Sequence, residues 1–317
     1  MRKTLAALAT LAFAASCQGG SRKETPAPTP PAATPAAAPT TTPPPAAAPA
    51  PAPAPPPAGL VLLDPGAEPR RVLRYDIAPG TQQRFEVVVD QTAKMAQGPM
   101  PEMKLPTTQL SGTIVFAPRA AEGAMPYALT IDKVDFLDTP GASMSAAQLR
   151  QMVGPLGGVK ATAVLDPQGT IHGFQIDLAK LPPQTQKMLE GMTYDQMAAR
   201  LPEQPIGKGA RWRVVQHVVR GAIRLVQTTD VELVELRGNR ARLKNAVTIE
   251  APPQKVAQGG GTAELKKMIG QGTADVRIDL RKLLGPATMA MHIDQEMTMG
   301  AQTLSVAVDE ATKLSPR

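Results

Sequence analysis

The sequence predicts a mainly β protein with minor α, built as a curved antiparallel sheet or half-barrel with one or two short helices packed on it. Apolar and polar residues alternate with a period of two over most of the folded part, which is typical of half-buried strands. Glycine, proline, asparagine and aspartate separate these runs at short intervals. The chain has a single cysteine, so no intramolecular disulfide can form and the fold must depend on its apolar core.

Residues 1–16 have the features of a secretory signal peptide. Arg2 and Lys3 precede an uncharged stretch, which is too short for the roughly 20 residues that a membrane-spanning helix needs. The segment Ala14-Ala15-Ser16-Cys17 resembles the lipobox of bacterial lipoproteins, with Ala14 where leucine is usual. That resemblance implies acylation of Cys17 and anchoring to a membrane, and Gln18 after it implies the outer membrane. The alternative is an ordinary secreted protein with an unmodified cysteine.

Residues 17–59 are expected to form a disordered tether behind the lipidated cysteine. From Glu24 to Ala58 the chain contains only Glu, Thr, Pro and Ala, and proline occupies 15 of these 35 positions. Such a segment has too little apolar surface to offset its ordering entropy, and proline keeps it extended. We therefore expect a semi-rigid spacer, followed by a β-rich globular domain over residues 60–317.

The first half of that domain begins with three apolar runs that predict strands. These are Phe85–Val89, Thr113–Phe116 and Tyr127–Ile131, with a hairpin loop at Arg119–Met125. Ser145 is placed to cap a short helix that runs to Val153.

Two further strands and a second helix are expected after this. Asp166-Pro167-Gln168-Gly169 predicts a tight turn between strands at Val159–Leu165 and Thr170–Asp177. The second helix, at Gln184–Leu201, is predicted from apolar residues spaced three and four apart, with Gly191 as the point of a kink.

The second half contains another hairpin and a methionine-rich strand. Gly238-Asn239 is a hairpin turn signal between strands at Val231–Leu236 and Arg240–Ile249. Over residues 289–299 a strand would place four methionines and one isoleucine on one face, and polar residues on the other. The first set is Met289, Met291, Ile293, Met297 and Met299, and the second is His292, Asp294, Glu296 and Thr298.

The two halves, residues 70–200 and 201–317, have similar patterns. Ile77-Ala78-Pro79-Gly80 leads into one strand and Ile206-Gly207-Lys208-Gly209 into another, and each is followed by a hairpin meander. This pattern predicts two duplicated β-meander modules. The alternative is that both halves share only the general habit of β meanders.

Short motifs in both halves resemble a family of uncharacterised bacterial lipoproteins known as a domain of unknown function. The matching residues are Leu73-Arg74-Tyr75, Gly80, Leu201-Pro202, Pro205, Gly207 and Lys208-Gly209-Ala210-Arg211-Trp212. This resemblance implies no activity. A looser likeness, at the level of the fold, is to periplasmic lipid-carrier lipoproteins, which cover a half-barrel sheet with helices.

The sequence shows no motif that names a reaction. The histidines His172, His217 and His292 lack metal-ligand spacing, and no serine lies in a nucleophile elbow. The net charge is +7, but aromatic residues are only 3% of the chain, which argues against nucleic-acid binding. We therefore expect a protein that is not an enzyme and has no cofactor.

Methionine is the unusual component, with 15 residues against 5 Phe, 3 Tyr and 1 Trp. Its flexible, polarizable side chain suits a surface for variable apolar ligands, and the candidates for lining a ligand cavity are Trp212, Met289, Met291, Met297 and Met299. The expected function is therefore non-catalytic binding of an apolar ligand such as lipid, or of an envelope component such as the cell wall. The alternatives are a scaffold that pairs with an envelope protein and, more remotely, a copper site at Met289, Met291 and His292.

Overall fold

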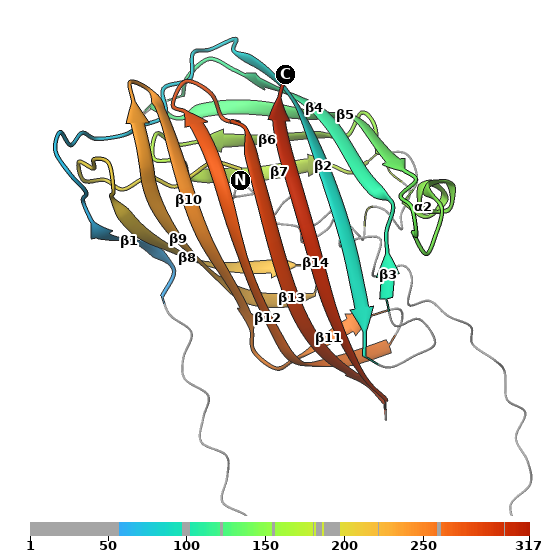
Figure 1. Ribbon diagram of the computed structural model, residues 1–317. Helices are drawn as coiled ribbons and strands as arrows, with labels where there is room; N and C mark the ends of the chain where they lie inside the picture. Colours follow the sequence, from blue (N-terminus) through green and yellow to red (C-terminus); the bar gives the residue numbers. More distant parts are fainter. Residues whose placement is uncertain are drawn as a thin grey trace, which may run out of the picture.

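The computed structural model describes residues 57–96, 102–120, 123–153, 156–179, 181, 186, 197–220, 222–258, 261–300 and 302–317. These residues form one large antiparallel sheet and one short helix, which confirms the predicted fold class (Figure 1). The elements of the first half are β1 (Gly59–Asp64), β2 (Gln82–Met95), β3 (Glu102–Lys104), β4 (Thr107–Phe116), β5 (Met125–Leu137), α2 (Ala146–Val153), β6 (Lys160–Leu165) and β7 (Ile171–Asp177). Those of the second half are β8 (Arg211–Arg220), β9 (Ile223–Arg237), β10 (Arg240–Ala251), β11 (Gln254–Gln258), β12 (Gly261–Asp279), β13 (Ala287–Met299) and β14 (Gln302–Pro316).

Both halves of the domain belong to the same sheet. Its strand order is β1-β8-β9-β10-β12-β13-β14-β2-β4-β5-β6-β7, with β3 paired to β2 and β11 to β12. The halves join where β14 pairs with β2, from Pro316 opposite Phe85 to Val306 opposite Met95. The path ends at β1 and β7, so the sheet is open and these two strands are its edges.

The sheet curves until its two flanks contribute to one core. Figure 1 shows β6 and β7 behind the long strands of the second half. Leu165 and Ile171 from β6 and β7 belong to the same buried cluster as Leu233 and Leu243 from β9 and β10. The sheet therefore has a concave inner face, which carries most of the buried side chains, and an outer face.

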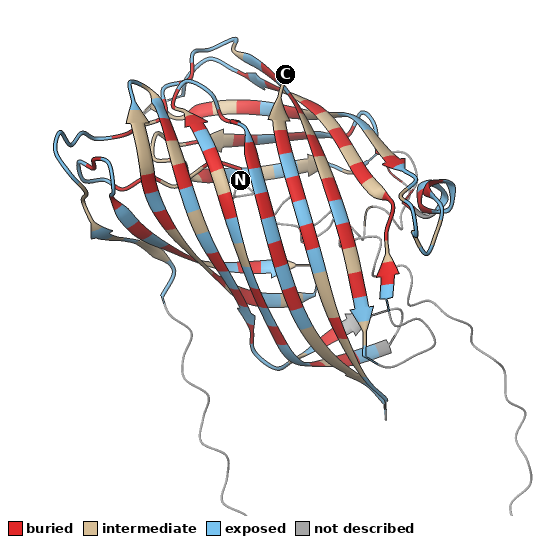
Figure 2. Cartoon of the chain, in the orientation of Figure 1, coloured by how far each residue is buried: buried red, intermediate tan, exposed pale blue. Residues whose placement is uncertain are grey.

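Burial alternates along each long strand, as Figure 2 shows by its bands of red and pale blue. In β13, Met289, Met291 and Ile293 are buried on the inner face, while His292 and Asp294 are exposed on the outer face. This is the strand geometry that the alternation of methionine with polar residues predicts.

Two extended segments, 65–81 and 197–210, cross one end of the curved sheet. The N–H of Tyr75 donates to the carbonyl of Pro167 and the N–H of Asp76 donates to that of Leu280, both at 2.8 Å. Arg71 and Ile206 exchange backbone hydrogen bonds between the two segments. Because both segments bring buried side chains into the same cluster, we call this part of the molecule the closed end. Its cluster includes Leu73, Tyr75, Ile77, Phe85, Leu201, Ile206 and Trp212.

Glycine allows the two crossing segments to touch. A Cβ on Gly207 would lie 1.8 Å from the carbonyl oxygen of Ala67, and one on Gly66 would lie 2.5 Å from the backbone nitrogen of Ala210. Gly66 also has a φ of 78°, which disfavours other residues. Both positions thus require glycine for backbone proximity.

The segments that lead into β2 and β8, which have similar sequence patterns, are held by equivalent backbone hydrogen bonds. The N–H of Gly80 donates to Phe116 of β4, and the N–H of Phe116 donates to Thr81. In the second half, the N–H of Gly209 donates to Leu233 of β9, and the N–H of Leu233 donates to Ala210. Both glycines have positive φ, of 76° and 82°. The two halves therefore enter their first long strands through the same local geometry.

The local turn and cap predictions are confirmed. The Asp166 carboxylate accepts hydrogen bonds from the N–H groups of Gln168 and Thr170, and Gly169 has a φ of 89°. Gly238, with a φ of 52°, lies in the connection between β9 and β10. Ser145 caps α2 in a capping box, because its Oγ accepts from the N–H of Gln148 while the Gln148 Oε1 accepts from the N–H of Ser145.

The second predicted helix, Gln184–Leu201, is wrong at its end. Residues 197–201 are not helical, because this part of the chain extends across the closed end and the N–H of Leu201 donates to the carbonyl of Gln168. Gln186 is helical, and the rest of the range lies outside the described residues. The apolar spacing at Met197 and Leu201 reflects burial in the closed-end cluster rather than helical periodicity.

Candidate functional site

An apolar floor covers part of the inner face, over the strands of the second half. Its members are buried and belong to one cluster, separate from the closed-end cluster. Methionine and isoleucine dominate it, and the side chains of Ile249, Ile293 and Met291 pack over Gly270 and Gly272 of β12. We define the apolar floor by the residues Val247, Ile249, Leu265, Met268, Met289, Met291 and Ile293.

The structure places the predicted cavity residues in three different surroundings. Met289 and Met291 lie in the apolar floor, and Met297 packs against its margin. Met299, at the end of β13, is 41% exposed. Trp212 is fully buried in the closed-end cluster, where its indole N–H donates to the carbonyl of Arg200 at 2.9 Å. The structure thus brings Met289, Met291 and Met297 together, whereas Met299 is exposed and Trp212 packs in the separate closed-end cluster.

The predicted acylation site, Cys17, lies outside the described residues. His292, the third residue of the copper alternative, lies on the outer face, opposite to Met289 and Met291.

Polar side chains that the sequence analysis did not single out flank the apolar floor on the same face. On one side Gln91 of β2 pairs with Glu310 of β14, and Glu310 pairs with Met291. On the other side Gln227 of β9 pairs with Ile249. All three polar residues are buried. The sequence carries little signal for them, because Gln227 and Glu310 are followed at the next inward position by another polar residue, Thr229 and Thr312.

The two glutamines and one further inner-face amide, Asn245, each have a buried oxygen without a donor. Gln91 Oε1, Gln227 Oε1 and Asn245 Oδ1 have no hydrogen-bond partner within the described part of the chain. Such atoms are uncommon in folded proteins and require an explanation. The amide nitrogen of Gln227 is satisfied, since it donates to Thr229 Oγ1 at 3.2 Å.

Two opposite charges from the two flanks influence each other across the inner face. Arg220, near the end of β8, is separated from Glu310 of β14 by four strands in the sheet order. Burial lowers the pKa of the Arg220 guanidinium, and the negative charge of Glu310 opposes that shift. The curvature of the sheet therefore brings charges from distant strands toward each other. Glu310 also accepts a hydrogen bond from Thr312 Oγ1 at 3.1 Å.

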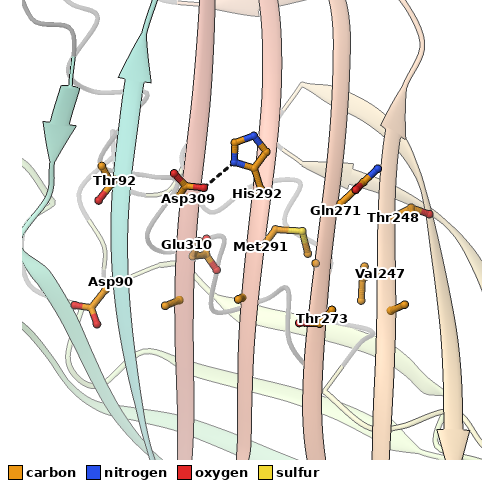
Figure 3. A pocket seen from close by; sticks show the side chains of 14 residues that line it. Asp90, Thr92, Val247, Thr248, Gln271, Thr273, Met291, His292, Asp309 and Glu310 are labelled. Carbon is orange, nitrogen blue, oxygen red and sulfur yellow. Dashed lines mark hydrogen bonds and ion pairs between the residues drawn. The ribbon is translucent and has the colours of Figure 1, made fainter.

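The outer face carries an open trough of about 700 Å³ across five strands (Figure 3). One row of cross-strand partners along it is polar and comprises Thr92, Asp309, His292, Gln271 and Thr248. The parallel row has mostly small side chains and comprises Asp90, Ala311, Ala290, Thr273 and Ala246. The trough is thus a shallow depression where small side chains lower the surface of the sheet.

His292 is the titratable centre of this trough. Its Nδ1 lies 2.7 Å from Asp309 Oδ1, the contact drawn in Figure 3, and its Nε2 lies 3.3 Å from Asp294 Oδ1. The hydrogen bond to Asp309 raises the pKa of His292, burial opposes this rise, and the Asp294 carboxylate adds to it. The imidazolium form is therefore favoured in the folded protein.

Among the described residues, no group of three or more His, Cys, Asp and Glu side chains is arranged to hold a metal ion. Within the same residues, no helix is both long and apolar enough to cross a membrane.

Comparisons with known proteins give little. No protein-family model and no curated protein matches the chain. Among solved structures, a mutant of the Rh. blastica porin is similar at 8% identity and a TM-score of 0.22, over 74% of this chain and 100% of that one. A likeness at this level carries no argument, so the function must be inferred from the residues themselves.

Proposed function

We propose that this chain is a lipid-anchored lipoprotein of the bacterial cell envelope, in the outer membrane, and that its β domain binds an apolar ligand without catalysis. The observation that supports this most is the apolar floor on the concave face, built from long, flexible and branched side chains. Methionine surfaces adapt to ligands of variable shape, and acyl chains are the abundant apolar ligands of an envelope. The lipobox resemblance at Cys17 and the resemblance to lipid-carrier lipoproteins support the same function.

Native mass spectrometry tests this proposal. The protein is the chain from residue 17 onward with Cys17→Ser, exported to a bacterial periplasm so that no acyl anchor is added. We expect a bound mass of several hundred daltons that organic solvent releases. A bare, homogeneous chain mass, unchanged after incubation with phospholipid extract, would contradict ligand binding.

The alternative of a scaffold is favoured by one specific observation at an edge of the sheet. Within the described ranges β1 pairs only with β8, along one of its edges, and its residues Val61 and Leu63 are 58% and 55% exposed. Free strand edges with apolar side chains pair readily with another chain. Photo-crosslinkers at Val61 and Leu63 should capture a discrete envelope partner if this is the function. Val115, exposed on β4 but paired on both sides, is the matched control position.

The copper alternative rests on Met289 and Met291, which are two residues apart on one strand face. Replacing both by leucine should spare the binding of an apolar ligand, because the volume and character of the floor are kept. The same double variant should lose any copper that the native protein retains, as elemental analysis would show.

A further inference from the structure

The inner face holds hydrogen-bond acceptors that the fold itself leaves unused. Gln91 and Gln227 are each only 5% exposed, and their amide oxygens lack a donor within the described part of the chain, as does that of Asn245. A buried acceptor without a donor loses its hydration and gains nothing in return. Three such atoms on one face therefore indicate that donors arrive from elsewhere.

A second buried glutamine on β2, Gln83, has a structural role and differs from Gln91. Gln83, eight residues before Gln91 on β2, is also buried on the inner side. Its Oε1 accepts hydrogen bonds from the backbone N–H groups of Leu283 and Leu284, at 3.0 and 3.3 Å. Gln83 joins β2 to the β12–β13 connection, whereas the Gln91 oxygen lies beside the apolar floor with no such role.

The unused acceptors stand on both sides of the floor. Across the sheet, Gln227 is followed by Ile249, Gly270 and Ile293 in one row of partners. In the next row, Met291 is followed by Glu310 and Gln91. An acyl chain that lies on Ile249, Ile293 and Met291 would therefore have polar acceptors on either side of it.

The polar groups on this face favour the same kind of partner. A further acceptor, the buried carboxylate of Glu310, lies beside Gln91, and its charge interacts with that of Arg220. Hydroxyl and N–H groups of a ligand would complement these acceptors.

We propose that the inner face recognises an acyl lipid by a head group rich in hydrogen-bond donors, hydroxyl or amide N–H, which Gln91, Gln227 and Asn245 accept. This inference rests on the proposed function, since it takes the apolar floor as the seat of the acyl chain. It adds the chemical class of the head group. The competing explanation is that ordered water alone satisfies these oxygens.

A competition between two lipids with the same acyl chain tests the proposal. The protein is the Cys17→Ser chain from residue 17 onward, and the probes are 1-monopalmitoylglycerol, with two hydroxyl donors, and methyl palmitate, with none. Native mass spectrometry of an equimolar mixture gives the ratio of the two bound forms. We expect the monoacylglycerol to be preferred by about tenfold or more, since satisfying buried acceptors strongly favours a donor.

Leucine variants test whether the glutamines cause the preference for the monoacylglycerol. In Gln91→Leu combined with Gln227→Leu, the ratio should fall toward one while methyl palmitate still binds. The matched control is Gln271→Leu, the same change on the outer face of the same sheet, which should keep the native ratio.

The outcomes separate the two proposals. If neither lipid binds the native chain, the proposed function fails and this inference fails with it. If both bind with a ratio near one, or if the double variant keeps the native ratio, only the head-group inference is overturned. The ratio of bound monoacylglycerol to bound methyl palmitate in the native chain tests the head-group inference even if a variant does not fold.

Discussion

The closed end and the apolar floor are both buried, but the polar atoms beside them differ in whether they have hydrogen-bond partners. At the closed end the Trp212 indole donates to Arg200, the Tyr75 hydroxyl accepts from the N–H of Ala199, and Gln83 accepts from two backbone N–H groups. Tyr127 is an exception, since its hydroxyl has no partner in the described part of the chain. Beside the apolar floor, three amide oxygens lack donors. Under the proposed function, the closed end is a structural core and the floor is the part of the sheet that contacts the ligand.

Trp212→Ala should produce the largest loss of stability. It removes a fully buried indole and its hydrogen bond, so the free energy of unfolding should fall by about 3–5 kcal/mol. Urea denaturation measures the loss. Met299→Ala, at an exposed position, is the control and should change stability by no more than about 0.5 kcal/mol. If both substitutions changed the free energy of unfolding equally, the closed end would not be a structural core.

Gln83→Leu should be the next most severe change. Leucine fills a similar volume but leaves the N–H groups of Leu283 and Leu284 buried without an acceptor. The cost is about 2–4 kcal/mol of unfolding free energy, to be measured in the same urea series. A neutral result would show that water replaces the lost acceptor.

Gln91→Leu is the matched test of Gln83→Leu. It makes the same substitution on the same strand, but here we expect no loss of stability. It removes an oxygen that has no donor, so the ligand-free protein should be unchanged or more stable by up to about 1 kcal/mol. Thermal unfolding of matched delipidated samples measures this. A loss as large as that of Gln83→Leu would mean that the Gln91 amide is structural.

The smallest expected effect concerns pH and the outer trough. The pKa of His292 is raised in the folded protein by Asp309, so protonation stabilises the fold. This contribution is complete below the unfolded pKa of about 6.5 and is lost as the pH rises through the folded pKa. The melting temperature of the native chain should therefore fall slightly more between pH 6 and pH 8.5 than that of His292→Asn. If the melting temperatures of the two proteins changed with pH in the same way, the His292–Asp309 contact would contribute nothing to stability.

Local features of the fold could be predicted from the sequence because their causes are local. The Ser145 cap, the Asp166–Gly169 turn and the alternation along β13 each depend on a few neighbouring residues. The path of residues 65–81 across the closed end could not, because it depends on contacts with β6–β7 and with Leu280. The same long-range packing overrides the helical spacing at Met197 and Leu201.

The candidate site could be predicted only in part. The methionine face follows from a period of two, so Met289 and Met291 could be identified as neighbours. Gln91, Gln227 and Asn245 could not, since a polar residue in a strand is usually at the surface and its burial depends on distant strands. Their importance appears only once the curvature of the sheet is known.

The pairing of β2 with β14 also has a consequence for the order of folding. β2 is among the first strands in the sequence and β14 is the last, yet they are neighbours at the middle of the sheet. A chain that is synthesised from its N-terminus onward can pair β2 with β4 early, but the other edge of β2 must wait for β14 to arrive. During that interval an apolar strand edge is exposed, so a chaperone that shields β2 should raise the yield of folded protein.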